Sequence, residues 1–231
     1  MKAIRLNFKD IRASRQNNNN KLVYDSLRDG GLEYLMTIIN TKELERTLQD
    51  LELTIDQFVE KCRGDHYFCK LAARHISKCS SRQGSKDETE QLITCDLTTK
   101  HYGVRVINLS VNSVRPTKDG KIYTGAEVKN LNIAKDCCLK SFDAVIEGRI
   151  SGYISAKVAF GNGGHQDNVF EEMDVIAEWW KKYKAESSEF LVLLIDTDLT
   201  EKFNRVKEKY SDVKNILVCD HYDFQNYVIN L

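Results

Sequence analysis

The stretch that decides the fold spans residues 141–172 and reads SFDAVIEGRISGYISAKVAFGNGGHQDNVFEE. It opens with alternating apolar residues, as a half-buried strand does. A second strand-like run follows at Tyr153–Phe160, after a break at Gly148–Gly152. The composition of Gly161–Gly164 predicts a loop, and from about Gln166 the apolar spacing becomes helical. The stretch therefore predicts a hairpin, a tight loop and a long helix.

Beyond this stretch, strand and helix patterns alternate. Phe190–Ile195 is a continuous apolar run, typical of a strand buried on both faces. An amphipathic helical pattern at Glu201–Tyr210 follows, then a second buried strand at Val213–Val218 and a closing helix at His221–Ile229. Together with the hairpin, these elements predict an α/β fold with a central mixed β-sheet flanked by helices.

The first eighty residues are predicted to be mostly helical. Helical spacing covers Lys21–Ile39, Thr41 begins a second helix to about Leu51, and Thr54–Gln57 has the pattern of a capping box. The chain has one proline and no Ser/Gly-rich linker. We therefore predict a single domain over 1–231, with a helical N-terminal part (1–80) and an α/β core (81–231).

Between these parts, Ser85–Glu88 has capping-box spacing and predicts a helix from Lys86 to about Cys95. Arg82, Gln83 and Lys86 are grouped beside that predicted N-terminus. Such groups can contact phosphates or base edges, although a plain helix start explains them equally well. Further along, Tyr102–Leu109 and Ile122–Val128 are predicted strands.

Bulk composition limits the possible functions. The chain has 34 Lys and Arg against 34 Asp and Glu, so any DNA binding must come from local patches rather than from a cationic body. Seven cysteines without a regular framework favour reduced thiols and a cytoplasmic protein. The sequence contains no apolar run long enough to span a membrane, and its charged start does not resemble a signal peptide.

Three residues in the decisive stretch could carry chemistry. The hairpin can bring Asp143 on its first strand close to Lys157 on its second, and Glu171 follows one turn into the next helix. Hydrolysis of a phosphodiester needs a hard cation held by carboxylates and a group that positions or deprotonates water. We therefore predict a magnesium-dependent nuclease site; surface charge with one salt bridge is the alternative.

These residues resemble the PD-(D/E)XK restriction endonucleases. The usual acid two residues before the lysine is replaced by Ser155, in Ser155-Ala156-Lys157, and the proline position holds Phe142. This pattern is similar to that of a type II subgroup in which a glutamate has migrated to the next helix. Glu171 has the spacing of that glutamate, and Glu172 is the neighbouring candidate.

The resemblance implies a type II enzyme that cuts double-stranded DNA with Mg²⁺ as a symmetric homodimer, at a short GC-rich palindrome such as GGNCC. An N-terminal helix acid near the metal would be Glu88. Four base-reading residues would lie between the lysine and the glutamate: His165, Gln166, Asp167 and Asn168. Four more residues would also contact DNA: Arg82, Gln83, Lys86 and Ser155.

A second set matches the general family signature more literally. Asp119 is followed at the expected distance by Glu127-Val128-Lys129. We rank this set second, because a weak helix follows it rather than a strong helix and a buried strand. A turn with exposed charges explains it adequately.

Other interpretations remain open at this stage. Gly161–Gly164 could cradle a nucleotide phosphate in a noncatalytic α/β binding or regulatory module. Asp196 and Asp198 end a predicted strand and are expected to cap the following helix. Trp179 and Trp180 are expected in the core or, with Tyr183, at a subunit interface. A set of thiols and imidazoles without zinc-site spacing is expected to be buried or ordinary: Cys62, His66, Cys69, His75 and Cys79.

Overall fold

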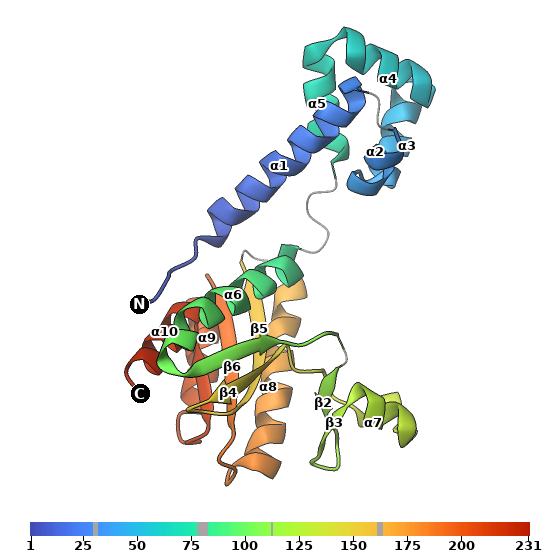
Figure 1. The fold of residues 1–231 in the computed structure, drawn as a ribbon. Helices are drawn as coiled ribbons and strands as arrows, with labels where there is room; N and C mark the ends of the chain where they lie inside the picture. Colours follow the sequence, from blue (N-terminus) through green and yellow to red (C-terminus); the bar gives the residue numbers. More distant parts are fainter. Residues whose placement is uncertain (30–31, 78–82, 112, 161–163) are drawn as a thin grey trace. The chain divides into compact units, whose positions relative to one another are not determined.

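The computed structural model describes residues 1–29, 32–77, 83–111, 113–160 and 164–231 (Figure 1). The chain divides into two compact units. The sheet unit comprises Met1–Leu6 and Gly84–Leu231, and the helical unit comprises Asn7–Gln83. The predicted single domain is thus resolved into two parts. The expected change from a helical part to an α/β core after residue 80 falls close to the boundary between Gln83 and Gly84. The first six residues, however, belong to the sheet unit.

The sheet unit is built on a five-stranded sheet in the order β1-β4-β5-β6-β7. Its strands are β1 (Val104–Asn108), β4 (Ala144–Gly148), β5 (Gly152–Ala159), β6 (Phe190–Thr197) and β7 (Ile216–Cys219). The first three strands pair antiparallel, and β5, β6 and β7 run parallel. This arrangement confirms the predicted α/β fold with a central mixed sheet.

Helices cover both faces of this sheet (Figure 1). One face packs on α6 (Gln83–Thr99) and α10 (His221–Ile229), and the other packs on α8 (Gly164–Lys184) and α9 (Thr200–Lys209). The alternation along β6 separates the two cores, since Leu193 joins the α8 side and Leu194 the α6 side. The sheet is therefore the middle of three layers.

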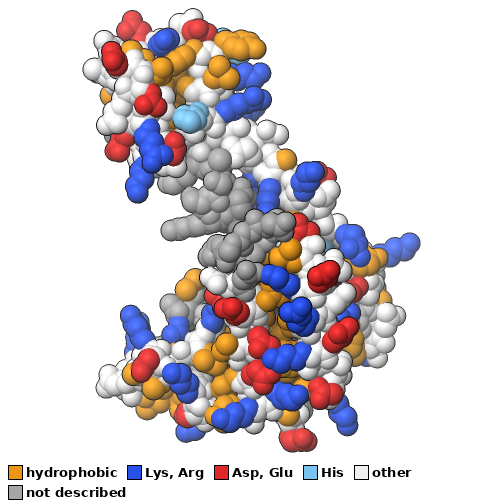
Figure 2. Space-filling model, turned by 180° about the vertical axis from the view of Figure 1, so that it is seen from behind, with side chains coloured by type: hydrophobic (Ala, Val, Ile, Leu, Met, Phe, Trp, Pro, Cys, Tyr) orange, Lys and Arg blue, Asp and Glu red, His pale blue; other side chains and the backbone are white. Residues whose placement is uncertain are grey.

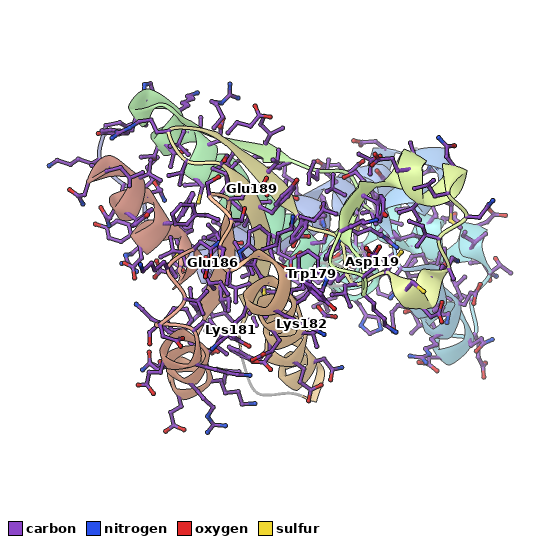
Figure 3. All side chains as sticks on the ribbon, turned by 90° about the horizontal axis from the view of Figure 1, so that it is seen from below. Asp119, Trp179, Lys181, Lys182, Glu186 and Glu189 are labelled. Atoms are coloured by element: carbon purple, nitrogen blue, oxygen red, sulfur yellow. The ribbon has the colours of Figure 1, made fainter. Side chains whose placement is uncertain are left out.

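A small hairpin lies beside α8. Strands β2 (Val114–Pro116) and β3 (Ile122–Thr124) pair antiparallel, and α7 (Gly125–Asn130) follows. The indole Nε1 of Trp179 donates to the Thr117 carbonyl at 2.6 Å, and Figure 3 shows Trp179 pointing toward the hairpin that carries Asp119. Two short 3₁₀ turns, Lys100–Tyr102 and Lys135–Cys137, lie between these elements.

The helical unit has its own core. Its helices are α1 (Phe8–Asp29), α2 (Leu32–Ile38), α3 (Thr41–Asp50), α4 (Ile55–Gly64) and α5 (His66–Ile76). Val23 and Leu27 of α1 pack against Cys69 and Ala73 of α5 within that core. The capping box at Thr54 and Gln57 is confirmed, because each side chain bonds the other's backbone amide.

Several predicted elements were wrong. The helix expected from Lys21 begins at Phe8 and includes the four asparagines of residues 17–20. Ser85 does not cap a helix, because α6 already begins at Gln83. The strand expected over Ile122–Val128 ends at Thr124, where a Thr124 capping box turns the chain into α7. In the last case one local signal, the capping box, ended the pattern of another, the strand.

The aromatic pair on α8 is core. Trp179 and Trp180 are both buried, and Tyr183 donates its hydroxyl to the Lys118 carbonyl. A subunit interface on the two tryptophans is therefore wrong, since the protomer itself covers them.

On the face of the sheet unit seen in Figure 2, acidic and basic side chains are interspersed, in keeping with the zero net charge. Among the described helices, we find none with the length and apolar content that a bilayer crossing needs.

Candidate active site at the end of strand β5

Asp143 is fixed against the neighbouring strand. It directly precedes β4, and its amide donates to the Ile154 carbonyl at 2.9 Å. The Ala156 amide in turn donates to Asp143 Oδ2 at 2.8 Å. One carboxylate oxygen is thus held by the backbone of β5, one residue before Lys157. The predicted hairpin therefore brings this acid and this lysine together.

Lys157 lies at the centre of a charged cluster. Its side chain enters from β5 and the residue is only 8% exposed. Its Nζ lies 3.3 Å from Glu88 Oε1 on α6 and 3.7 Å from Glu172 Oε2 on α8. Lys140, in the segment before β4, also pairs with Glu172. Helices from both faces of the sheet therefore meet one lysine at a strand end.

Burial and charge shift the pKa values of this cluster in different directions. Burial raises the pKa of Asp143 and that of Glu88 above their usual values, despite nearby lysines and, for Asp143, the Ala156 amide. Burial acts to lower the pKa of Lys157, but the charge of Glu88 and the other carboxylates raises it overall. Burial acts to raise the pKa of Glu172, but Lys140 and Lys157 lower it overall.

The donor set fits a hard cation only in part. No three His, Cys, Asp or Glu side chains in the described ranges form a ready metal-ligand group. Asp143 and Glu88 are nevertheless desolvated carboxylates, and the Asp143 charge raises the pKa of Glu88. Mg²⁺ is commonly bound by one or two carboxylates together with substrate phosphates and water. These two residues therefore suit Mg²⁺ when a phosphate-bearing substrate completes the set.

Of the two candidate glutamates on α8, Glu172 joins the cluster. Both glutamates are exposed, but Glu172 pairs with Lys157 and Lys140, and Glu171 forms no ion pair with a described residue. One residue on a helix corresponds to a rotation of about 100°, so neighbours cannot share a contact. Sequence spacing alone did not separate them. Lys140 was missed altogether, because nothing in its local pattern indicates a contact with a helix more than thirty residues later.

The predicted DNA-contacting residues that the structure describes belong to α6, β5 and α8. Lys86 on α6 and Asn168 on α8 are exposed. Ser155 is buried on β5, and its hydroxyl has no hydrogen-bond partner among the described residues. Gln83 begins α6, and three further residues lie in the first turn of α8: His165, Gln166 and Asp167. Arg82 lies outside the described residues, as do positions 161–163 of the glycine loop.

The second-ranked set does not form a comparable cluster. Glu127 accepts from the Thr124 amide and hydroxyl as part of a helix cap. Asp119 accepts from Thr117 in the β2–β3 turn, and Lys129 is exposed. The Thr117 hydroxyl lowers the pKa of Asp119, and the backbone amide of Thr124, followed by its hydroxyl, lowers the pKa of Glu127. Local turn and cap roles therefore account for both carboxylates.

Asp196 has a buried structural role that the sequence did not indicate. It does not cap α9, whose N-cap position is Leu199. Its carboxylate lies 2.6 Å from His221 Nδ1 and accepts from Gln91 Nε2 at 2.5 Å. His221 Nε2 accepts the Leu6 amide at 2.8 Å, so Nδ1 carries the proton toward Asp196. This network ties the N-terminal segment to the sheet unit.

The thiols expected to be buried are largely so. Cys62 and Cys69 are fully buried in the helical core, and burial raises the pKa of Cys62 to about 12. A neutral thiol of this kind is a weak metal ligand. Cys79 lies outside the described residues.

Comparison of the chain with protein-family models, with curated proteins and with solved structures found no match in any of the three.

Proposed function

We propose that this protein is a type II site-specific deoxyribonuclease. It hydrolyses phosphodiester bonds of double-stranded DNA with Mg²⁺, at a short palindromic, GC-rich site. One observation carries the proposal: buried Lys157 at the end of β5 is held by Glu88 and Glu172, beside the fixed carboxylate of Asp143. This is the combination of acids and a lysine that metal-assisted phosphodiester hydrolysis uses.

Each residue of the cluster has a separate role in this proposal. Asp143 and Glu88 would hold Mg²⁺, which when bound stabilises charge on the phosphate and lowers the pKa of water. The carboxylates raise the pKa of Lys157, so its ammonium stays protonated at neutral pH. Lys157 therefore orients the attacking water and donates to a phosphate oxygen rather than accepting a proton. Glu172, held by Lys140, keeps the Lys157 side chain in place.

A purely structural ion pair is less consistent with the charges. A carboxylate that serves only in a salt bridge normally has a lowered pKa, because the cation favours its charged form. Burial leaves the pKa of Asp143 and of Glu88 raised instead. Burial disfavours the charged forms of Asp143, just before β4, and of Glu88, on α6, which lowers the stability of the fold, and such perturbed groups concentrate at functional sites. A cation would relieve them.

Recognition and symmetry follow from the same proposal. The first turns of α6 and α8 both lie near the cluster in sequence, since Lys86 precedes Glu88 and Asn168 precedes Glu172. Exposed Lys and Asn side chains can contact phosphates and base edges. A palindrome presents the same edges twice, so a C2 homodimer would place one active site on each strand.

Cleavage of phage DNA by the full-length protein tests the proposal. With Mg²⁺ we expect discrete fragments whose sequenced ends share one short motif. Asp143→Ala and Lys157→Ala should lower cleavage by at least about 10²-fold, while Glu127→Ala and Lys129→Ala leave it intact. Binding of DNA in Ca²⁺ should survive in all four variants. Loss of cleavage only in the Glu127 or Lys129 variant, or no cutting with any divalent metal, would overturn it.

A further inference from the structure

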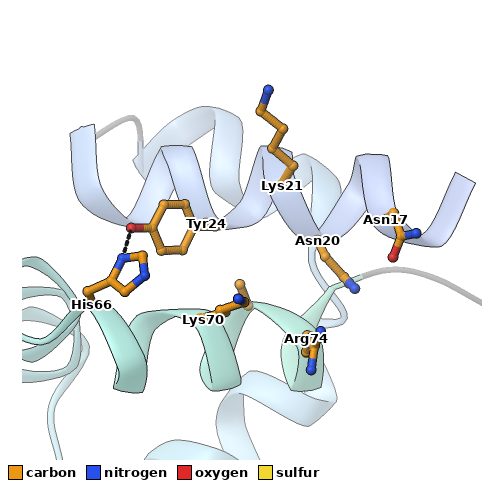
Figure 4. Close-up of a pocket in the computed structure, with 8 residues that line it drawn as sticks. Asn17, Asn20, Lys21, Tyr24, His66, Lys70 and Arg74 are labelled. Atoms are coloured by element: carbon orange, nitrogen blue, oxygen red, sulfur yellow. Dashed lines mark hydrogen bonds between the residues drawn. The ribbon is translucent and has the colours of Figure 1, made fainter. Parts of the chain in front are cut away.

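A second site lies in the helical unit, in a pocket between α1 and α5 (Figure 4). The pocket has a volume of about 260 Å³. Its lining is polar and basic around one alanine, and consists of Asn17, Asn20, Lys21, Tyr24, His66, Lys70, Ala73 and Arg74. All of these residues belong to the helical unit.

The helical repeat explains why these residues meet. The lining residues are at positions 17, 20, 21 and 24 on α1 and at positions 66, 70, 73 and 74 on α5. Residues three and four apart share one helix face. The two helices pack through Val23, Leu27 and Cys69, which brings the polar faces together beside the core.

The charge of the pocket is of one sign. Lys21, Lys70 and Arg74 line it, and no carboxylate does. Within the described ranges, none of these three side chains forms an ion pair. All three are exposed, and Figure 4 shows Lys21 extending from α1 on the side away from α5, whereas Lys70 and Arg74 belong to α5. Cationic side chains around a hollow that no carboxylate lines favour the approach of an anion.

The neutral polar groups are also arranged as donors. The Oδ1 of Asn20 accepts from Gln16 and from Ser77, which leaves its NH₂ group as the part that can donate to a ligand. The Tyr24 hydroxyl lies 2.6 Å from His66 Nδ1, so a ring proton on Nε2 can point outward (Figure 4). Cations and N–H donors around one hollow match a ligand with several acceptor oxygens.

We propose that the α1/α5 pocket binds a phosphate group, carried either by a nucleic-acid strand or by a free nucleotide. Phosphate offers both the charge and the acceptor oxygens that Lys, Arg and Asn recognise. The pocket is slightly smaller than the roughly 300 Å³ of the smallest typical small-molecule sites, which suits one nucleotide unit. The inference does not rest on the proposed nuclease activity, because the two sites lie in different units.

Binding without cleavage tests the inference. A short fluorescent DNA duplex is titrated with the full-length protein in EDTA, and its anisotropy is followed at several salt concentrations. Lys70→Glu/Arg74→Glu should weaken binding at least about 10-fold and reduce the salt slope by about 1 to 2. The matched control Lys42→Glu/Arg63→Glu reverses two exposed charges outside the pocket, on α3 and α4, and should change affinity less than about 2-fold.

Two further titrations distinguish a free nucleotide from a nucleic-acid strand as the source of the phosphate. Adenosine monophosphate and inorganic phosphate are titrated by calorimetry into the wild type and into the milder variant Lys70→Gln/Arg74→Gln. If adenosine monophosphate or phosphate releases heat on binding the wild type but not the pocket variant, the ligand is a free nucleotide. If neither does and DNA still binds, the ligand is the phosphate backbone of a DNA strand. Equal loss of DNA affinity in pocket and control variants, or no binding of any of the three ligands by the wild type, would overturn the inference. A protein that binds phosphate here yet never cuts DNA would refute only the nuclease proposal.

Discussion

The Lys157 ammonium lies 3.3 Å from the Glu88 carboxylate, although 69 residues separate them in the chain. The contact joins β5 to α6, and the Lys157–Glu172 pair joins the same strand to α8. The two helices cover opposite faces of the sheet. A single buried lysine therefore links all three layers at the point where we place catalysis.

The two neighbouring glutamates of α8 should differ sharply in effect. Glu172→Gln removes a charge that pairs with Lys157 and Lys140, and we expect DNA cleavage to fall about 10- to 100-fold, as for residues that position a catalytic group. Glu171→Gln is the matched control and should cleave like the wild type, because the ion pairs with Lys157 and Lys140 are made by Glu172. Initial rates on one plasmid substrate measure both. The reverse order of effects would assign the role to Glu171.

Asp143→Asn should make the protein inactive without making it less stable at neutral pH. Burial raises the pKa of Asp143, so the folded chain holds this proton more tightly than the unfolded chain does. Ionisation therefore costs stability, and the cost is absent below the unfolded pKa of about 3.9 and complete above the raised folded pKa. The melting temperature of the variant relative to wild type should rise as pH increases through that window, then level off.

Metal addition gives the same residue a second readout. Mg²⁺ or Ca²⁺ should raise the melting temperature of the wild type, because a ligand of the folded state stabilises it. The shift should shrink or vanish in Asp143→Asn and persist in Lys129→Ala. An equal metal-induced shift in both variants, or a melting temperature of Asp143→Asn below wild type at every pH, would contradict Asp143 as a strained cation ligand.

Gly148 at the end of β4 should not tolerate a side chain. Its φ is +119°, and a Cβ there would lie 2.0 Å from the Gly103 carbonyl oxygen. Gly148→Ala must strain the backbone and push β1 away from β4, at a cost of at least about 1–3 kcal/mol. Chemical denaturation measures the loss. Gly64→Ala is the control, because its Cβ would meet nothing within 4 Å and should leave stability unchanged or slightly raised.

Thiol reactivity should follow burial. Cys137 is exposed, whereas Cys62, Cys95 and Cys219 are buried, and burial raises the pKa of each buried thiol. Only the thiolate reacts, so a chromogenic disulfide at pH 8 should label Cys137 within minutes and the three buried thiols only after unfolding. Peptide mapping identifies the labelled positions. Rapid native labelling of Cys62, whose pKa is about 12, would argue against the packing of α4 on α5.

The proposed homodimer is open to a direct measurement. Light scattering at micromolar concentration, with and without a DNA duplex bearing the cleaved motif, should give twice the protomer mass at least in the presence of DNA. Trp179→Phe serves as a check on the surface involved. Since Trp179 is core, its substitution should lower the stability of the protomer and leave the dimer mass unchanged. A monomer in both conditions that still cuts both strands in one binding event would contradict the dimer.

Local periodicity was enough to predict much of the fold. The apolar runs of β5 and β6, the helix at His221–Ile229 and the Thr54 cap follow from two-, three- and four-residue spacings that depend on the chain itself. Predictions failed where the extent of an element was misjudged. A capping box at Thr124 ends the predicted strand and begins α7, and the helix expected from Lys21 begins at Phe8.

The sequence by itself predicted the hairpin that brings Asp143 close to Lys157, because the two strand patterns are separated by a short glycine-flanked break. Only the tertiary structure decided which distant acids complete the cluster. The rotation of α8 brings Glu172 rather than Glu171 to the lysine, and the packing of α6 across the opposite face brings Glu88. Both depend on how helices pack on the sheet, and that free energy comes from buried area spread over many residues rather than from the spacing of any few.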